Sequence, residues 1–260
     1  MSFPARYAVL LDGGFLIRKL SDRTRPRIFP SAADIAGVAT AIAAHSCVTG
    51  LTRLRTYFYH AHPATGTLRN PISGAEINLA RTDVYHQHES LLEKLELLPD
   101  FALRLGSTST REWKIGERAL KSLLQSPRLI AADDLIPNIE QKGVDLRIGL
   151  DIARLALTRS VQSIVAVTAD SDFVPAFKFA RREGLRVFLC HFDHPIKREL
   201  RVHIDDVIHI GPDAAGAWPT PLLSATPGPG STSKPSRDYQ SGPTGSTLMV
   251  AGGPARPPPL

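Results

Sequence analysis

The chain has 260 residues, a formal net charge of +6 and a pI near 9.5. This length is sufficient for one sizeable α/β domain with an ample core, and the mild basic excess is compatible with a polyanionic partner without identifying one. The only two cysteines, Cys47 and Cys190, stand beside apolar residues, which argues against a disulfide framework or a cysteine-based zinc site. The first apolar run is too short for a signal sequence or a membrane span, so we expect a soluble, cytoplasmic protein.

The pattern of apolar residues predicts alternating strands and helices. A capping box at Ser31–Asp34, with aspartate in place of the usual glutamate, marks the start of one helix. Strand followed by helix followed by strand favours right-handed βαβ units and a mainly parallel sheet covered on both faces, which is an α/β fold class. We expect strands at residues 7–12, 54–59, 163–168 and 186–190, and helices at residues 15–20, 31–46, 84–98, 146–158 and 173–183.

The composition divides the chain into a body and a tail. Residues 1–210 carry the predicted elements, with an insertion around residues 62–140 that holds one helix and a hairpin turning at residues 107–110. Residues 211–260 are rich in Pro, Gly, Ser and Thr and show no apolar periodicity, so we expect a disordered tail. Its isolated Trp218 and the pair Leu222–Leu223 are the candidates for docking on the rest of the chain.

Carboxylates follow two of the predicted strands and open one predicted helix. Asp12 ends the first apolar run, Asp170 and Asp172 end a later one, and Asp145 begins an apolar-periodic helix. Such runs indicate strands buried on both faces of a parallel sheet, and ligands bind beyond the carboxyl ends of these strands. Unpaired carboxylates gathered at that edge are costly unless cations neutralise them. The hard cations that carboxylate oxygens prefer are Mg²⁺ and Mn²⁺.

Helix capping competes with this interpretation at two of the motifs. Ser171 is a suitable N-cap, and Asp172 with Pro175 would then lie in a first helical turn, where negative charge is favoured. Asp145 also stands at a helix start. Asp12 has no such explanation, because the two glycines after it are poor capping partners but permit close approach of a backbone or substrate.

Several cations are candidates for contact with nucleic acid. Lys142 and Gly143 precede Asp145, supplying a flexible approach and a cation suited to a phosphate. Arg111 and Lys114 flank Trp113, as in single-strand binders that combine basic grooves with aromatic stacking. The indole would equally suit a core position.

Two other groups of residues are interpreted as surface features. Asp151 has Arg147 and Arg154 four residues before and three residues after it, which favours a surface ion pair on one helix. Lys197 belongs to a basic stretch that reads as a solvated helix face. The pairs His60/His62 and His86/His88 are similarly taken as surface histidines, because no third zinc ligand is evident.

These motifs together resemble the NYN domain, a family of the PIN-like superfamily of metal-dependent nucleases, over most of residues 5–210. The resemblance implies a three-layer α/β/α PIN-like fold with metal-holding aspartates at Asp12, Asp145 and Asp170, and Asp172 as an adjunct. Many relatives carry an asparagine where Phe15 stands here. The matching segments are Leu11–Gly14, Lys142–Asp145, Gly149–Ala153, Thr168–Pro175 and Arg182–Phe188.

The function implied by the resemblance is a metal-dependent nuclease, in this family most often an (endo)ribonuclease, that hydrolyses phosphodiester bonds with Mg²⁺ or Mn²⁺ and water as the nucleophile. The sequence leaves open RNA against DNA and endo against exo cleavage. Metal ions can activate the water and stabilise charge on the leaving oxygen. The expected catalytic residues are Asp12, Asp145 and Asp170, and the expected contacts to single-stranded RNA are Lys142, Arg111 and Lys114. No membrane partner is expected, and a homodimer is left open.

Two other function classes remain as alternatives. A phosphatase-like or TOPRIM-like enzyme also places acidic pairs after a strand, but the first would have threonine or valine at Phe173 and the second glutamate at Asp12. The other alternative is a catalytically silent module with the same fold that binds nucleic acid or has a regulatory role. The presence of Phe15 in place of the family asparagine is the reason to retain this alternative. Metal-dependent cleavage of a labelled RNA separates the nuclease from the silent module.

Overall fold

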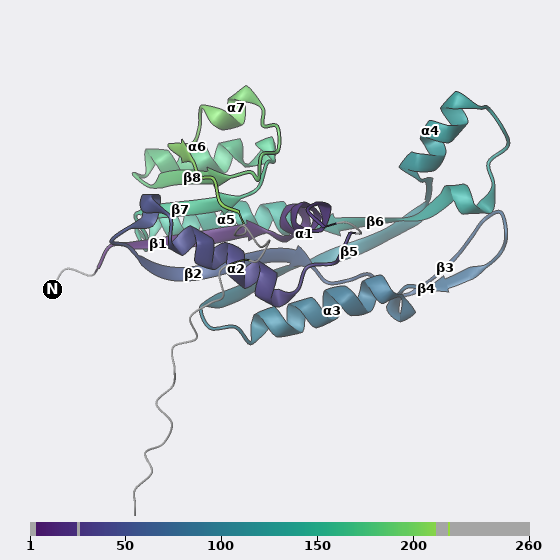
Figure 1. Cartoon of the computed structure of the whole chain (residues 1–260), viewed down its shortest axis with the longest axis horizontal. Coiled ribbons are helices and arrows are strands. Elements are labelled where there is room, and N and C mark those ends of the chain that lie inside the picture. Colours follow the sequence, from purple (N-terminus) through teal and green to yellow (C-terminus); the bar gives the residue numbers. More distant parts are fainter. Residues whose placement is uncertain (1–3, 25–26, 212–217, 219–260) are drawn as a thin grey trace, which may run out of the picture. The chain divides into compact units, whose positions relative to one another are not determined.

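The computed structural model describes residues 4–24, 27–211 and 218, which belong to the first of two compact units, residues 1–222. Its centre is a seven-stranded sheet with the order β6-β5-β2-β1-β7-β8-β9 (Figure 1). Neighbouring strands are parallel except for β5 and β6. The strands are β1 (Arg6–Asp12), β2 (Thr52–Ala61), β5 (Phe101–Ile115), β6 (Leu135–Lys142), β7 (Ser163–Val167), β8 (Arg186–Cys190) and β9 (Asp206–Val207).

Helices cover both faces of the sheet, which explains why its central strands read as continuous apolar runs. Alternate residues of β1 enter two separate cores: Ala8 and Leu10 pack with helices α5, α6 and α7, and Tyr7, Val9 and Leu11 pack with α1, α2 and α3. The predicted three-layer α/β fold with a mainly parallel sheet is confirmed. The helices are α1 (Gly13–Asp22), α2 (Ala32–Ala43), α3 (Asp83–Glu96), α4 (Glu117–Gln125), α5 (Val144–Leu157), α6 (Val174–Arg182) and α7 (Arg198–Arg201).

The predicted hairpin at residues 101–115 is wrong, because β5 is one continuous strand of 15 residues. Its first part pairs parallel with β2, and from Ser107 onward it pairs antiparallel with β6. The two ladders meet at Gly106, where a Cβ would collide with the carbonyl oxygen of Lys142. The polar residues 107–110 have the composition of a turn, but they form a strand because β6 pairs with them. The sequence of β6 gives little indication of a strand, because it contains Pro137.

Smaller elements complete the insertion between β2 and β5 and the segment after β5. Strands β3 (Thr67–Arg69) and β4 (Glu76–Asn78) form a separate two-stranded sheet that precedes α3. Helix α4 follows β5, and Figure 1 shows it at the end of the β5–β6 ribbon that lies away from β1. Side chains of α4 are not buried within the described part of the chain.

One local capping signal in the sequence marks a helix start correctly. The capping box of α2 is confirmed: the amide of Asp34 donates to Ser31 Oγ at 3.2 Å, and the amide of Ser31 donates to Asp34 Oδ2 at 2.8 Å. Within the described residues, the helices are all too short or too polar to cross a membrane.

Most of the predicted tail, residues 212–217 and 219–260, lies outside the described residues, so its disorder stays a prediction. Trp218 is described and packs against the core formed with α1, α2 and α3. Its ring centroid lies 6.0 Å from that of Phe192, and the guanidinium of Arg23 lies 5.8 Å from it.

Candidate functional site

The predicted acidic edge, which comprises Asp12, Asp145, Asp170 and Asp172, is found near the carboxyl ends of the central strands β1 and β7, where the strand order reverses. From β1 the chain adds β2, β5 and β6 on one side and then returns to place β7, β8 and β9 on the other. Crevices at the carboxyl ends of strands bind ligands at such a reversal. Asp12 is the last residue of β1, and Asp170 follows β7 by three residues. Both line a cavity of about 370 Å³.

Asp12 is fixed by two hydrogen bonds at the start of α1. Its Oδ1 accepts from the amide of Phe15 at 3.1 Å, so the side chain is the N-cap of this helix, and the expectation that Asp12 has no capping role is wrong. Its Oδ2 accepts from the hydroxyl of Thr168 at 3.0 Å. Burial raises the pKa of Asp12, and the charges of Asp145 and Asp170 raise it further.

Asp170 caps the turn that leads from β7 into α6. Its Oδ1 accepts from the amide of Asp172 at 2.9 Å, and its own amide donates to the Thr168 hydroxyl at 3.2 Å. The N-cap of this turn is therefore Asp170, and the prediction that Ser171 is the N-cap is wrong. Asp172 is exposed beside it in this short 3-10 turn. Thr168 thus joins Asp12 to the Asp170 turn.

Asp145 reaches the same region from another element. It lies in the first turn of α5 after Gly143, whose φ of 72° is left-handed, and this helix start has no side-chain cap. Burial raises the pKa of Asp145, and the charges of Asp170 and Asp172 raise it further. Asp12 and Asp145 therefore each feel the charge of carboxylates that lie 25 or more residues away in sequence.

These four carboxylates fit a hard divalent cation by their chemistry, because Mg²⁺ and Mn²⁺ prefer carboxylate oxygens. No ion pair with Lys, Arg or His reaches any of them within the described residues. However, the described residues contain no group of three or more acidic, His or Cys side chains close enough together to hold a metal. The chemistry of the donors is suitable, but the carboxylates would have to move closer together to share one ion.

Basic side chains line the same cavity. Arg18, His194 and Lys197 line it, and Lys197 Nζ donates to Ser171 Oγ at 3.1 Å. The pKa of His194 is lowered by burial and by the charges of Lys19 and Arg18, so its imidazole favours the neutral form. Sequence reasoning assigned Lys197 to a solvated helix face and did not single out Arg18 or His194. Arg18 lies in α1, six residues after Asp12, and carries no motif, whereas His194 and Lys197 lie more than 20 residues after Asp170 in the sequence.

The other predicted nucleic-acid contacts lie on the β5–β6 ribbon. Lys142 Nζ lies 2.7 Å from Glu140 Oε2, and Arg111 Nε lies 3.4 Å from the same oxygen. The charge of Lys114 also helps to lower the pKa of Glu140, after the hydrogen bond from Lys142 and the charge of Arg111. The indole of Trp113 donates to the backbone carbonyl of Arg69 at 2.8 Å, which fastens the β3–β4 segment to the ribbon.

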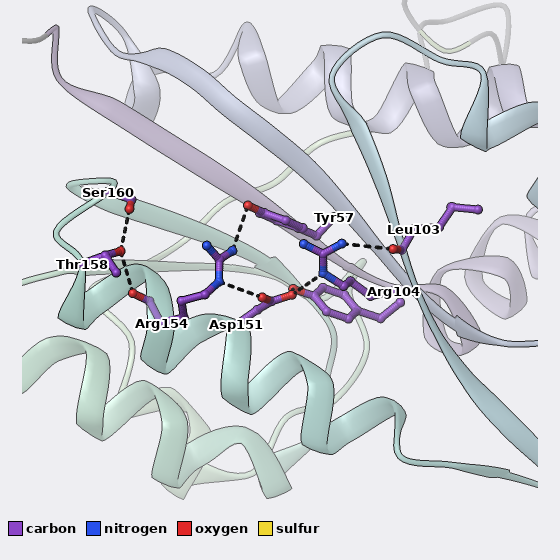
Figure 2. A network of polar contacts seen from close by, with 8 residues as sticks. Tyr57, Leu103, Arg104, Asp151, Arg154, Thr158 and Ser160 are labelled. Atoms are coloured by element: carbon purple, nitrogen blue, oxygen red, sulfur yellow. Dashed lines mark hydrogen bonds and ion pairs between the residues drawn. The ribbon is translucent and has the colours of Figure 1, made fainter.

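Asp151 is buried in a separate polar network (Figure 2). Its Oδ2 accepts from Arg104 Nε at 2.9 Å and from the Tyr59 hydroxyl at 3.0 Å, and its Oδ1 accepts from Arg154 Nε at 3.2 Å. The predicted pair with Arg154 is confirmed. The predicted surface location and the pair with Arg147 are wrong, because β5 supplies Arg104 and the sheet covers the carboxylate.

Residues 111–211 match the family described as NYN domain, which is consistent with an NYN domain protein of the PIN-like superfamily and with the observed fold. No curated protein matches the sequence. Among solved structures, a protein of unknown function from Vibrio parahaemolyticus is 15% identical with a TM-score of 0.45, over 81% of this chain and 96% of that chain. The NYN domain points to a nuclease of the PIN-like type, which acts on nucleic acid.

Proposed function

We propose that this protein is a metal-dependent endoribonuclease whose catalytic residues are Asp12, Asp145 and Asp170. The observation that supports the proposal is the group of carboxylates at the strand-order reversal, where neighbouring carboxylates help to raise the pKa of Asp12 and of Asp145 and no ion pair reaches the group among the described side chains. Natural proteins retain uncompensated charge of this kind most often where chemistry requires it. The NYN match to residues 111–211 supports the same class of reaction.

The three aspartates, with Asp172, would hold Mg²⁺ or Mn²⁺. When bound, the ion would help to deprotonate water at neutral pH and would stabilise charge on the phosphoryl oxygens. Thr168 orients the carboxylate of Asp12 through its hydroxyl, and the amide of Asp172 orients that of Asp170. These bonds use one lone pair of each bonded oxygen and leave others free for a cation.

The basic groups would position the substrate. Arg18 and Lys197 face the cavity, where their charges suit the phosphate oxygens of a strand that crosses it. Lys142 stands three residues before Asp145, and Arg111 and Lys114 continue the positive charge along the ribbon. We propose single-stranded RNA as the substrate and the cytoplasm as its setting. Binding should weaken as salt concentration rises, because the contacts are to phosphates.

A silent nucleic-acid-binding module is the second candidate, and one observation favours it. Phe15 occupies the position where many NYN relatives have asparagine, and its buried side chain lines the cavity beside Asp12. Its ring lies 6.0 Å from that of His194 and places apolar surface where the asparagine amide would be. Such a surface removes one polar contact to substrate or water.

Cleavage of a labelled single-stranded RNA with and without Mg²⁺ or Mn²⁺ tests the proposal. We expect the wild type to cleave only with the metal, Asp170→Asn to be inactive, and the control Asp133→Asn, an exposed carboxylate outside the cavity, to be fully active. The metal should raise the melting temperature of the wild type and the control more than that of Asp170→Asn, because a ligand stabilises the state that binds it. Binding without cleavage by the wild type would favour the silent module.

A further inference from the structure

A second cavity, of about 420 Å³, lies between the end of β2, the start of α3 and strand β6. Its walls are apolar: Ile77, Val84 and Ile139 line it while remaining 37%, 62% and 41% exposed, and Tyr85 stands beside them. Asp, Glu, Lys and Arg are absent from the described residues that line it. Its size falls in the range of small-molecule sites, roughly 300–1,000 Å³, and its chemistry suits an uncharged ring and not a phosphate.

The polar end of this cavity is formed by His60 and Gln141. His60 is only 3% exposed, which corrects its interpretation as a surface histidine, and burial lowers its pKa to about 4. The Gln141 amide Nε2 lies 2.9 Å from His60 Nδ1 and donates to it, so the neutral ring carries its proton on Nε2. Nε2 is buried and has no hydrogen-bond partner among the described residues. Such an unsatisfied buried donor is uncommon in native proteins.

Gln141 also connects this cavity to the acidic edge. A Cβ placed on Gly14 would lie 3.6 Å from Asp12 Oδ1 and 3.9 Å from Gln141 Oε1. The same amide therefore contacts His60 with its nitrogen and faces the region of Asp12 with its oxygen. A nucleic-acid strand with a phosphate at the carboxylates would have a neighbouring nucleotide within reach of the apolar cavity.

We propose that this cavity is a base-binding subsite, which takes one nucleobase of the single strand next to the phosphate held at the acidic edge. The position of the base next to that phosphate rests on the proposed nuclease function. The binding of a base in the cavity rests on the residues of the cavity alone. The apolar walls would contact the faces of the base, and the exposed Gln141 amide, which His60 holds in place, would contact its polar edge. Base stacking of this kind tolerates different bases, and hydrogen bonds to the edge add preference among them.

A metal site is the competing use of these histidines, and the geometry disfavours it. The ring of His88 lies 5.2 Å from that of His60, but its Nδ1 is bonded to the carbonyl oxygen of Val84 at 2.8 Å. His60 Nδ1 is likewise occupied by Gln141. Metal-holding groups of three or more His, Cys or acidic residues are absent from the described chain, these histidines included.

The test is a scan of short single-stranded RNAs in which each nucleotide in turn lacks its base. Binding is measured by fluorescence anisotropy with Asp170→Asn protein, so that the strands stay intact. In this background Ile139→Trp fills the cavity. Ile136→Trp is the matched control, because Ile136 lies on the same strand, is 43% exposed and does not line the cavity. Val84→Trp fills the cavity from α3 and serves if Ile139→Trp fails to fold.

We expect removal of one particular base to weaken binding about tenfold, the scale of a single stacked base. This penalty should fall below about twofold in Ile139→Trp or Val84→Trp and persist in Ile136→Trp. An equal penalty in all variants, or none at any position, would overturn the base-binding subsite. Lack of cleavage by the wild type would count against the nuclease function instead, and the scan would still decide whether the cavity holds a base.

Discussion

Two acidic regions of this protein treat their carboxylates in opposite ways. Asp151 is buried and receives hydrogen bonds from two arginines and a tyrosine, so its charge is compensated within the chain. Asp12 and Asp145, at the carboxyl edge of the sheet, have pKa values raised by burial and by neighbouring carboxylates. The compensated charge of Asp151 holds α5 against β2 and β5, whereas the uncompensated carboxylates are available to bind a cation. The difference separates a structural aspartate from candidate functional ones.

The largest expected effect comes from breaking the compensated region. Asp151→Asn removes the charge that Arg104 and Arg154 share, while the amide occupies the same space. We expect a loss of about 2–3 kcal/mol in the free energy of unfolding, below the usual 3–5 kcal/mol for a broken buried pair because both guanidinium groups reach solvent. Urea denaturation measures this loss. An unchanged midpoint would mean that the network contributes nothing to stability.

The packing beneath the uncompensated edge gives the next effect. A Cβ at Gly13 would lie 2.6 Å from the Tyr59 carbonyl oxygen and 2.7 Å from the Phe58 ring, so Gly13→Ala should cost about 1–3 kcal/mol. Gly14→Ala is the matched control, because its Cβ would meet only ordinary contacts at 3.6 Å and beyond. We expect it to be neutral or to stabilise α1 by up to about 1 kcal/mol. Thermal melts of the two variants should therefore move in different directions, and equal destabilisation would contradict the close packing at Gly13.

A smaller effect is expected from neutralising one member of the uncompensated edge. Asp145→Asn removes a carboxylate that raises the pKa of Asp12 and breaks no hydrogen bond described for its side chain. We expect the metal-free protein to keep its stability within about 0.5 kcal/mol, with any change toward greater stability. Urea denaturation in the presence of a chelator checks this. A loss comparable to that of Asp151→Asn would remove the distinction between the two regions.

The smallest effect is a dependence of metal-free stability on pH. A raised pKa means that the folded state of Asp12 and Asp145 binds protons more tightly than the unfolded chain does. Their stabilising contribution is therefore complete below pH about 4, the usual Asp range, and is lost as pH rises through the raised values. Urea midpoints measured upward from pH 4 should show this fall, and Asp145→Asn should reduce it relative to Asp133→Asn. A slope that is the same in both variants would argue against coupling between the carboxylates.

The sequence predicted the elements whose signals are local. Buried parallel strands, the capping box at Ser31 and the helices that follow are confirmed within a few residues. The hairpin at residues 101–115 is wrong because strand pairing is not local: β5 continues since β6 lies beside it. Capping was assigned to the wrong residues for a similar reason, because which carboxylate turns back onto a helix start depends on the backbone at that start. Asp12 and Asp170 do so, and Asp145 does not.

The α/β class, the NYN resemblance and the aspartates worth testing can be read from the amino-acid sequence, because apolar runs and the residues at their ends are properties of short segments. Which charges are compensated depends on the folded chain. The tertiary structure brings Arg104 of β5 to Asp151, places Lys197 beside the Asp170 turn, and joins Gln141 to His60 at the wall of an apolar cavity. These pairs lie 26 to 81 residues apart in sequence, and their interactions depend on distances of a few ångströms that no local pattern encodes.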